Sequence, residues 1–200
     1  FMLLDAVKGK NPSYDSKDLE TIVKGLAEFH RASRGFFPPG GCKPKCHLGT
    51  WIDDYRLRVE ELNGFYKNEL AKRDPGVIGK TITEEFPYFY SVALNVVEAL
   101  RGPEYKNWVS RAEKEGCLCH QDFAAGNLII APSGELFVLD TDSITIDIPA
   151  RDIRKLLNKV MKKKGKWDAG LTGKILHCYQ LVNPLTRNEW KVVGLDIMYP

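Results

Sequence analysis

Apolar residues recur every three or four positions along most of the chain, the spacing of an α-helix with one buried face. The clearest stretch runs from Leu19 to His30, where Asp15 or Ser16 can cap the helix and Gly35 can end it in a left-handed turn. The same spacing predicts further helices at residues 50–73, about 83–101 and from about 151 to 164. Additional helices are expected at residues 104–114, at 167–182 and from 186 onwards. Most of the chain is therefore predicted to be helical.

Helix boundaries follow from capping and breaking residues. Thr50 with Asp53 predicts an N-cap with an acid at the third helical position, and Thr186 with Glu189 predicts a capping box. Asp74-Pro75-Gly76 should end the second helix, and Pro87 should fall in the first turn of the third, where proline is tolerated. Three prolines and four glycines predict a loop at residues 35–49.

The apolar period changes at residues 127–131 and 136–140, which are short β-rich runs separated by the turn sequence Pro132-Ser133-Gly134-Glu135. This pattern predicts a β-hairpin, and residues 1–4 predict another short strand. Asn127 begins the first strand of the hairpin and Asp140 ends the second, so antiparallel pairing should bring both side chains to the same end. Asp122 lies in the loop that enters that end.

Composition excludes several classes of protein. A chain of 200 residues with 44% hydrophobic and 28% charged residues is typical of one globular domain. No run approaches the roughly 20 apolar residues of a membrane span, and a net charge of +3 is too small to indicate nucleic-acid binding. Five cysteines, an odd number, favour a reducing compartment over a disulfide framework.

The ends of the sequence predict a fragment. The chain opens on Phe1 in the middle of the predicted strand, without the pattern of a secretory signal, and it stops within a predicted helix just after Tyr199. We therefore expect that both termini are truncated.

The acids and the amide near the hairpin predict a chemical centre. Magnesium prefers carboxylate and amide oxygens and is held by one or two protein acids together with substrate phosphates. Asn127 and Asp140 supply such oxygens, and Asp122, one loop away, can accept a proton from a hydroxyl that attacks a phosphate. The alternative is that all three are only turn or cap residues.

The motif His120-Gln-Asp122-Phe-Ala-Ala-Gly-Asn127, followed by Leu139-Asp140-Thr-Asp142, resembles the catalytic and metal loops of aminoglycoside phosphotransferases and choline kinase relatives, within the protein-kinase-like superfamily. More narrowly, HQDFAAGN, VLDTDS and IDIPARDIRKLLNKVM together resemble the CotS-type spore-coat proteins of endospore-forming bacteria. The combination of motifs and spacings is specific, whereas H-x-D-x-x-x-x-N alone would be weak evidence.

The resemblance implies an α+β, mainly α-helical fold: the C-terminal lobe of a kinase-like domain over residues 1–200, with residues 1–5 as hinge strand and a small β-hairpin that carries the catalytic and metal loops. No glycine-rich phosphate loop and no strand lysine paired with a helix glutamate are visible in this sequence. We therefore expect the N-terminal nucleotide lobe to lie upstream and the fragment alone to be inactive.

The resemblance also implies roles for single residues. Asp122 would be the catalytic base, Asn127 and Asp140 the Mg²⁺ ligands, and Asp142 would either touch the metal or cap the following turn. His120 would shape the catalytic loop, and Asp152 would accept hydrogen bonds from its backbone. The expected ATP contacts are Leu3, Leu4 and Asp5 along the adenine edge and Leu128 or Leu139 under the base.

Two functions remain open at this stage. The first is an ATP-dependent phosphotransferase that acts on a hydroxyl of a small molecule or a coat saccharide. The second is a structural coat component that keeps the kinase-like fold without catalysis and works by assembly with other spore-coat proteins. Either would place the parent protein in the mother-cell cytoplasm and the spore coat.

Three further features are expected to have structural rather than functional roles. His30 is expected to be packed rather than catalytic. A basic run lies on and just after the helix near Asp152 and consists of Arg151, Arg154, Lys155, Lys159, Lys162, Lys163, Lys164 and Lys166. It is expected to be a solvated face, with binding of phosphate, an acidic partner or the coat as the alternative. Zinc bound by Cys42, Cys46 and His47 with Cys117, Cys119 and His120 is the weaker alternative to free thiols, because the spacings are not the usual ones.

Overall fold

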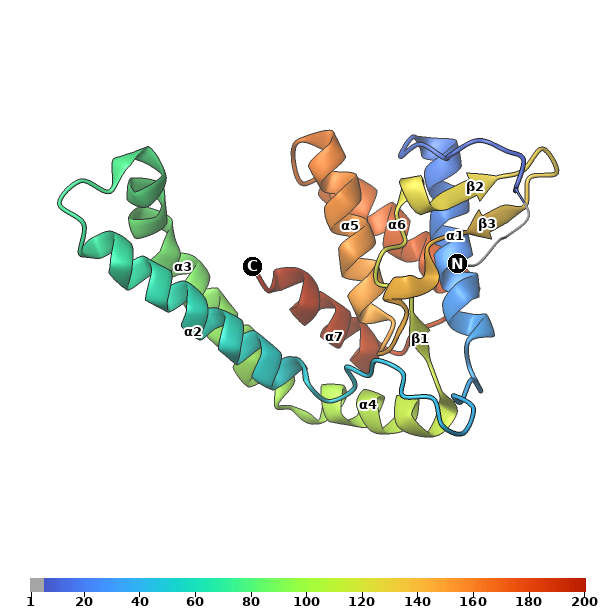
Figure 1. Cartoon of the computed structure of the whole chain (residues 1–200), viewed down its shortest axis with the longest axis horizontal. Helices are drawn as coiled ribbons and strands as arrows, with labels where there is room; N and C mark the ends of the chain where they lie inside the picture. Colours follow the sequence, from blue (N-terminus) through green and yellow to red (C-terminus); the bar gives the residue numbers. More distant parts are fainter. Residues whose placement is uncertain (1–5) are drawn as a thin grey trace.

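A computed structural model of the chain describes residues 6–200 (Figure 1). Within that range it contains seven α-helices and two small antiparallel sheets of two strands each, so the prediction of a mainly helical fold is confirmed. Leu3, Leu4 and Asp5, the expected adenine contacts, lie outside the described residues.

The elements follow one another in a simple order along the chain. The helices are α1 (Ser16–Ala32), α2 (Trp51–Leu70), α3 (Gly76–Leu100), α4 (Pro103–Glu115), α5 (Ala150–Lys164), α6 (Ala169–Val182) and α7 (Arg187–Met198). The strands are β1 (Leu118–Cys119), β2 (Leu128–Ile130), β3 (Leu136–Val138) and β4 (Thr145–Ile146), with 3₁₀ turns η1 (Ala125–Asn127) and η2 (Thr141–Ser143).

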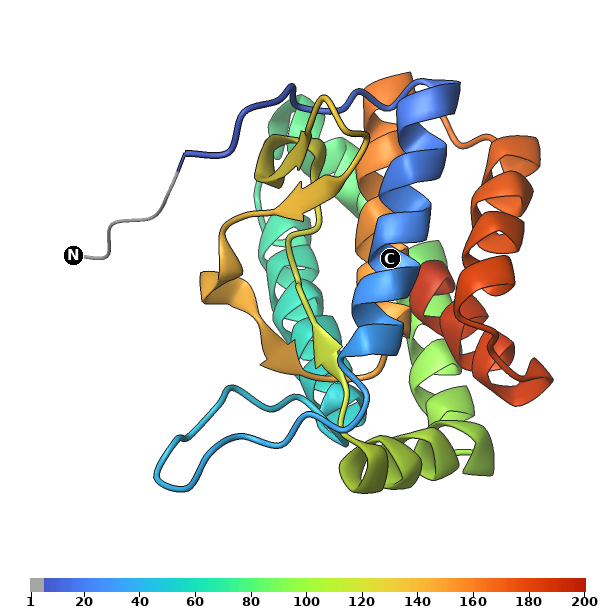
Figure 2. The ribbon, with the colours of Figure 1, turned by 90° about the vertical axis from the view of Figure 1, so that its right-hand side faces the viewer.

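The molecule consists of a body and an arm. Helices α2 and α3 pack against each other and project from the body as a long helical hairpin, while α1, α5, α6 and the strands lie on the other side of α7 (Figure 1). Figure 2 shows α1 next to the strands, and α1 packs against α6 as α5 does against α7. The candidate loops therefore belong to the body and not to the arm.

The first helix forms as the apolar period predicts. Leu19, Ile22 and Leu26 are buried in the core, and the Asp15 side chain accepts a hydrogen bond from the Asp18 amide, which caps the helix. Gly35 has φ +83°, so the predicted left-handed turn is also confirmed.

The third helix begins seven residues earlier than predicted, at Gly76 rather than Thr83. Pro87 consequently lies in the helix interior, and its placement in the first turn was wrong. The apolar period does not mark residues 76–82 because Val77 and Ile78 are exposed and no buried face repeats there. Packing of α3 against α2, including the stacked rings of Tyr66 and Phe86 with centroids 4.5 Å apart, offsets the cost of the proline.

The start of α2 is correct but its predicted cap is not. Thr50 already has helical backbone angles and its side chain caps no amide. Its hydroxyl instead donates to Asp54 Oδ2 at 2.6 Å and lies 3.1 Å from the carbonyl oxygen of His47. The capping box of α7, formed by Thr186 and Glu189, is present as predicted.

The predicted hairpin is confirmed as β2 and β3, with Leu128 opposite Val138 and Ile130 opposite Leu136. A second pairing joins β1 to β4, with Leu118 opposite Ile146 and Cys119 opposite Thr145. Strands of two residues are too short to carry a periodic signal, which is why sequence patterns missed this sheet. It lies directly before the loop that contains His120 and Asp122.

None of the helices in residues 6–200 combines the length and apolar character needed to cross a membrane.

Replacing the interior proline should stabilise the arm. Pro87→Ala restores a helical hydrogen bond and removes a steric clash, so we expect the free energy of unfolding to rise by about 2 kcal/mol. The midpoint of thermal unfolding, measured by circular dichroism, reports the change. Ser91 is an exposed residue one turn further along α3, and Ser91→Ala should have little effect on the midpoint. A lower midpoint for Pro87→Ala would show that the proline is required for the packing of α3 on α2.

Candidate functional site

Three residues with oxygen-bearing side chains lie at one end of the β2–β3 hairpin. The Leu139 amide donates to the Asn127 carbonyl at 2.8 Å, so Asn127 faces Leu139 across the hairpin and Asp140 follows one residue beyond. The side-chain nitrogen Nδ2 of Asn127 donates to the Asp122 carboxylate at 2.8 Å and to the Asp122 backbone carbonyl at 3.0 Å. Asp122 and Asn127 are therefore in direct contact, and Asp140 leaves the hairpin at the same end.

The backbone is strained on both sides of this site. Gln121 and Asp140 have φ of +68° and +57°, and they are the non-glycine residues of the described chain that adopt positive φ. Such conformations cost free energy and persist where the surrounding structure enforces them, often at functional sites. Strain at these two positions, one in each loop, favours a functional interpretation over a plain turn.

His120 connects the two loops from within the core. Its side chain is fully buried, with Nε2 3.1 Å from the Leu139 carbonyl oxygen and Nδ1 3.3 Å from the Asp122 amide nitrogen. A neutral ring with the proton on Nε2 satisfies both contacts, since Nε2–H donates to the carbonyl and Nδ1 accepts from the amide. The imidazole thus fixes the spacing between Asp122 and the strand that leads to Asp140.

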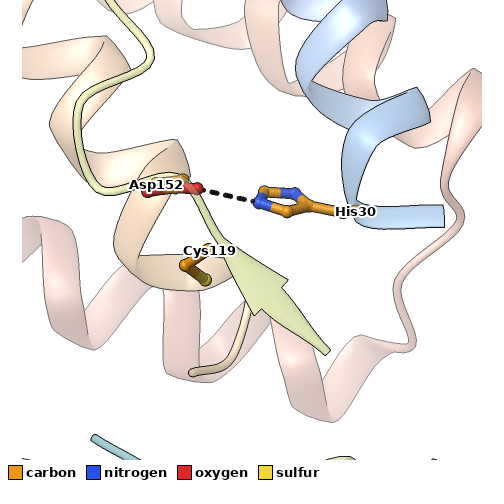
Figure 3. A group of neighbouring side chains, drawn as sticks. All are labelled: His30, Cys119 and Asp152. Atoms are coloured by element: carbon orange, nitrogen blue, oxygen red, sulfur yellow. Dashed lines mark hydrogen bonds and ion pairs between the residues drawn. The ribbon is translucent and has the colours of Figure 1, made fainter. Parts of the chain in front are cut away.

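The backbone of the loop at His120 and Gln121 is anchored by a buried carboxylate. Asp152, in the first turn of α5, accepts hydrogen bonds from the amides of His120 at 2.6 Å and Gln121 at 2.8 Å. Its Oδ2 also lies 3.1 Å from Nε2 of the buried His30 (Figure 3). These contacts hold the strained Gln121 in place.

His30 itself is oriented by two residues of the α6 region. Its Nδ1 is 2.8 Å from the Tyr179 hydroxyl, and the Asn183 amide donates to that same hydroxyl at 2.8 Å. With a neutral His30, Tyr179 donates to Nδ1 while Nε2–H donates to Asp152. Each hydrogen bond in this series from Asn183 to Asp152 then donates in the direction of the carboxylate. Burial raises the pKa of Tyr179, which keeps its phenol protonated. His30 is packed as predicted, but sequence patterns gave no sign of its link to Asp152.

Cys119 lies beside this pair, and the ligand atoms of His30, Cys119 and Asp152 fall within 4.8 Å of one another (Figure 3). All three are already in hydrogen bonds: His30 and Asp152 contact each other, and the Cys119 thiol is 3.1 Å from the Ile148 carbonyl oxygen. Burial raises the pKa of Cys119 well above the usual value. A protonated thiol is not a metal ligand, so the group is a hydrogen-bonded anchor.

The zinc alternative is not supported. Cys42 and Cys46 are exposed, whereas Cys117 and Cys119 are buried. Among residues 6–200 the His30, Cys119 and Asp152 group is the one cluster of three or more metal-binding side chains, and it excludes Cys42, Cys46 and His47.

Two lysines of α5 reach the loop that contains Gln121 and Asp122. Lys159 Nζ forms an ion pair with Asp122 Oδ1, and Lys155 Nζ donates to the Gln121 carbonyl at 3.0 Å. The hydrogen bond from Lys159 holds the pKa of Asp122 below its usual value. The interpretation of the basic run as a solvated face is therefore wrong for these two residues, although Lys162, Lys163, Lys164 and Lys166 are exposed. Arg151, Lys155 and Lys159 are spaced four residues apart, which places them on one face of the helix. This spacing was the sequence signal that could have identified them.

The donor set at the hairpin end fits a magnesium ion. Within the described residues the Asp140 side chain is exposed and makes no ion pair, and the Asn127 amide oxygen accepts no hydrogen bond because only the amide nitrogen is engaged. A carboxylate and an amide oxygen that are both available match the ligand preference of Mg²⁺. Asp142 lies in η2 and is also exposed. Leu128 is buried beneath this end, and Leu139 is half-buried.

Sequence comparison identifies relatives over the whole described chain. A family model described as "Spore coat putative kinase YutH" matches residues 4–200. Spore coat protein S of Bacillus subtilis (strain 168) is 32% identical over 201 residues, which are 100% of this chain and 57% of the relative. The endospore coat-associated protein YutH of the same strain is 29% identical over 195 residues, 94% of this chain and 53% of the relative. The chain thus spans a little over half the length of these relatives.

Structural comparison identifies the same fold in a solved enzyme. A crystal structure of an aminoglycoside phosphotransferase from Alicyclobacillus acidocaldarius subsp. acidocaldarius DSM 446 superposes with a TM-score of 0.84 at 16% identity. The match covers 98% of this chain and 57% of that one. The predicted similarity of fold to aminoglycoside phosphotransferases is therefore confirmed.

Removal of the anchor should destabilise the protein. Asp152→Ala leaves the amides of His120 and Gln121 and the His30 ring without their buried acceptor, so we expect the free energy of unfolding to fall by about 3 kcal/mol or more. Urea denaturation measures the change. Asp142→Ala removes an exposed carboxylate from the adjacent turn and should shift stability by about 0.5 kcal/mol at most. Equal stabilities of the two variants would show that Asp152 does not anchor the loop.

Proposed function

The chain belongs to the YutH family of spore-coat proteins, and we propose on that basis that the full-length protein transfers the γ-phosphate of ATP to a hydroxyl group. One observation carries the proposal: Asp122 contacts Asn127, and Asp140 follows Leu139 at the same end of the β2–β3 hairpin, in loops that His120 and Asp152 hold in place. A structural descendant has no physical need for this set, because turns require neither two available oxygen ligands nor left-handed backbone at Asp140.

In this proposal each residue has a defined task. Asn127 through its amide oxygen and Asp140 through its carboxylate would hold Mg²⁺, which supplies positive charge to the phosphates of ATP. Asp142 is exposed next to Asp140 and is a further candidate ligand. Leu128 and Leu139, below this end of the hairpin, are candidates for the floor under the adenine, and Leu3, Leu4 and Asp5 for its edge.

Asp122 would orient the attacking hydroxyl. The acceptor oxygen forms a bond to the γ-phosphorus while the bond from phosphorus to the bridging oxygen breaks, ADP leaves, and the hydroxyl proton passes to Asp122. Because Lys159 lowers the pKa of Asp122, the carboxylate is ionised at neutral pH and able to accept that proton. A low pKa also makes it a weak base, which suits a role in orientation with proton transfer late in the reaction.

The assignment of lobes is part of the proposal. Residues 1–200 would be the C-terminal lobe of the kinase-like domain, joined through residues 1–5 to a nucleotide lobe that contributes the phosphate loop and its lysine. In support, the chain covers 57% of the aminoglycoside phosphotransferase chain with which it superposes. The activity therefore belongs to the full-length protein.

A structural role in the spore coat is the second candidate, and it would place the protein in the mother cell and the coat. The names of its relatives favour it, as does the apolar surface of the arm. Large apolar side chains are exposed along α2 and α3, namely Leu57, Leu62, Phe65, Leu70, Val77, Ile78, Tyr88, Phe89 and Leu94. Assembly with other coat proteins would cover such a surface, and it does not exclude catalysis.

Loss of the metal ligand should weaken nucleotide binding. For the full-length protein we expect calorimetric titration with Mg-ATP to give measurable heat, and Asp140→Ala to lower the affinity about tenfold or more, because the metal loses a charged ligand. Glu135→Ala, in the turn at the opposite end of the hairpin, should bind as the unmodified protein does. An absence of heat for the unmodified protein would leave only the structural role.

Loss of the carboxylate at position 122 should affect turnover and not binding. Asp122→Asn keeps the shape of the side chain but cannot accept a proton, so we expect the rate of ATP turnover to fall by about 10²–10⁴-fold while Mg-ATP affinity changes little. Turnover is measured as ADP release by the full-length protein. Unchanged turnover would exclude Asp122 from the reaction.

A further inference from the structure

The carboxylate of Asp122 is occupied on both oxygens. Oδ1 takes the ion pair from Lys159, and Oδ2 takes the hydrogen bond from Asn127. The Asn127 contact is compatible with catalysis, since its amide oxygen remains available. The Lys159 ammonium covers the oxygen that an incoming hydroxyl would otherwise reach. It must therefore move away from Oδ1 during the reaction.

The Lys159 contact is suited to exchange. The Lys159 and Asp122 side chains are 33% and 42% exposed, so water screens their attraction, and such pairs contribute little net stability. The lysine stem is long and flexible. Its ammonium can therefore leave Asp122 when another anion is offered nearby.

Two lysines of α5 contact the loop, and only one of them pairs with a carboxylate of the described residues. Lys155, one turn before Lys159, is half-buried and forms no ion pair with a carboxylate of residues 6–200; its ammonium donates to the Gln121 carbonyl. The acids packed near the start of α5 are already engaged, because Asp152 anchors the loop while Arg151 and Arg154 lie by Asp147 and Asp196. Two ammonium groups thus face the catalytic loop, where Asp122 offers one carboxylate to them.

We propose that the acceptor is an anionic hydroxyl compound whose carboxylate or phosphate group binds Lys159 and Lys155, and that this contact draws Lys159 away from Asp122. The proposal rests on the proposed function and adds the charge of the substrate to it. One ion pair replaces another, so the exchange costs little, and Oδ1 becomes free for the acceptor hydroxyl. A neutral hydroxyl compound offers no partner for Lys159, and an amine is repelled by both lysines.

The test uses three sugars that share a ring and differ in charge: glucuronate, glucose and glucosamine. Binding to the full-length protein without nucleotide is measured by ligand-observed saturation-transfer NMR and competition titration. We expect glucuronate to bind about tenfold more tightly than glucose, the worth of one charge-assisted hydrogen bond, with glucosamine weakest. Lys159→Gln should remove that preference, and Lys159→Glu should reverse it in favour of glucosamine.

Lys174→Gln is the matched control, because Lys174 is an exposed lysine of α6 that forms no ion pair within the described residues. It should leave the preference for glucuronate unchanged. Glucuronate that binds no better than glucose, or whose preference survives Lys159→Gln, would overturn the proposal. So would a Lys159→Gln variant that only slows ATP hydrolysis to water, since Lys159 would then serve the transferred phosphoryl group. Mg-ATP binding is scored separately, so failure of the phosphotransferase proposal is distinguishable from failure of this one.

Discussion

The site depends on a single buried carboxylate. Asp152 accepts hydrogen bonds from the backbone amides of His120 and Gln121. These bonds stabilise the strained left-handed conformation of Gln121, between a short strand and a loop. The carboxylate is itself oriented by His30, which Tyr179 and Asn183 orient in turn. Three helical regions that are distant in sequence, around α1, α5 and α6, therefore determine the position of one loop.

Helix α5 serves the site at two levels. Its first turn supplies Asp152, which acts on the loop from the core, and its middle supplies Lys155 and Lys159, which contact the loop from the solvent side. Because the three residues lie on one helix, their Cα atoms keep a fixed spacing relative to one another. The backbone of the loop at His120 and Gln121 and the electrostatics of Asp122 are consequently set by the same element.

The sequence predicted those features that arise from local chemistry. The buried face of α1, the Asp15 cap, the β2–β3 hairpin and the capping box of α7 each follow from a few neighbouring residues. Features that depend on tertiary contacts were missed or misplaced. The start of α3 depends on packing against α2, the β1–β4 pairing joins strands of two residues, and the contacts of His30 and Lys159 join residues 122 and 37 positions apart. The placement of Asn127 and Asp140 at one end of the hairpin was predictable because antiparallel pairing alone requires it.

The left-handed backbone at Asp140 has a consequence for the history of the family. Glycine adopts that conformation without the strain of a side chain, so a lineage that no longer uses the carboxylate can relieve the strain by exchanging it for glycine. Mutational drift at this position is therefore biased away from aspartate once selection for the charge is relaxed. A glycine at position 140 of a relative would therefore indicate relaxed selection for the charge, even where the surrounding fold is unchanged.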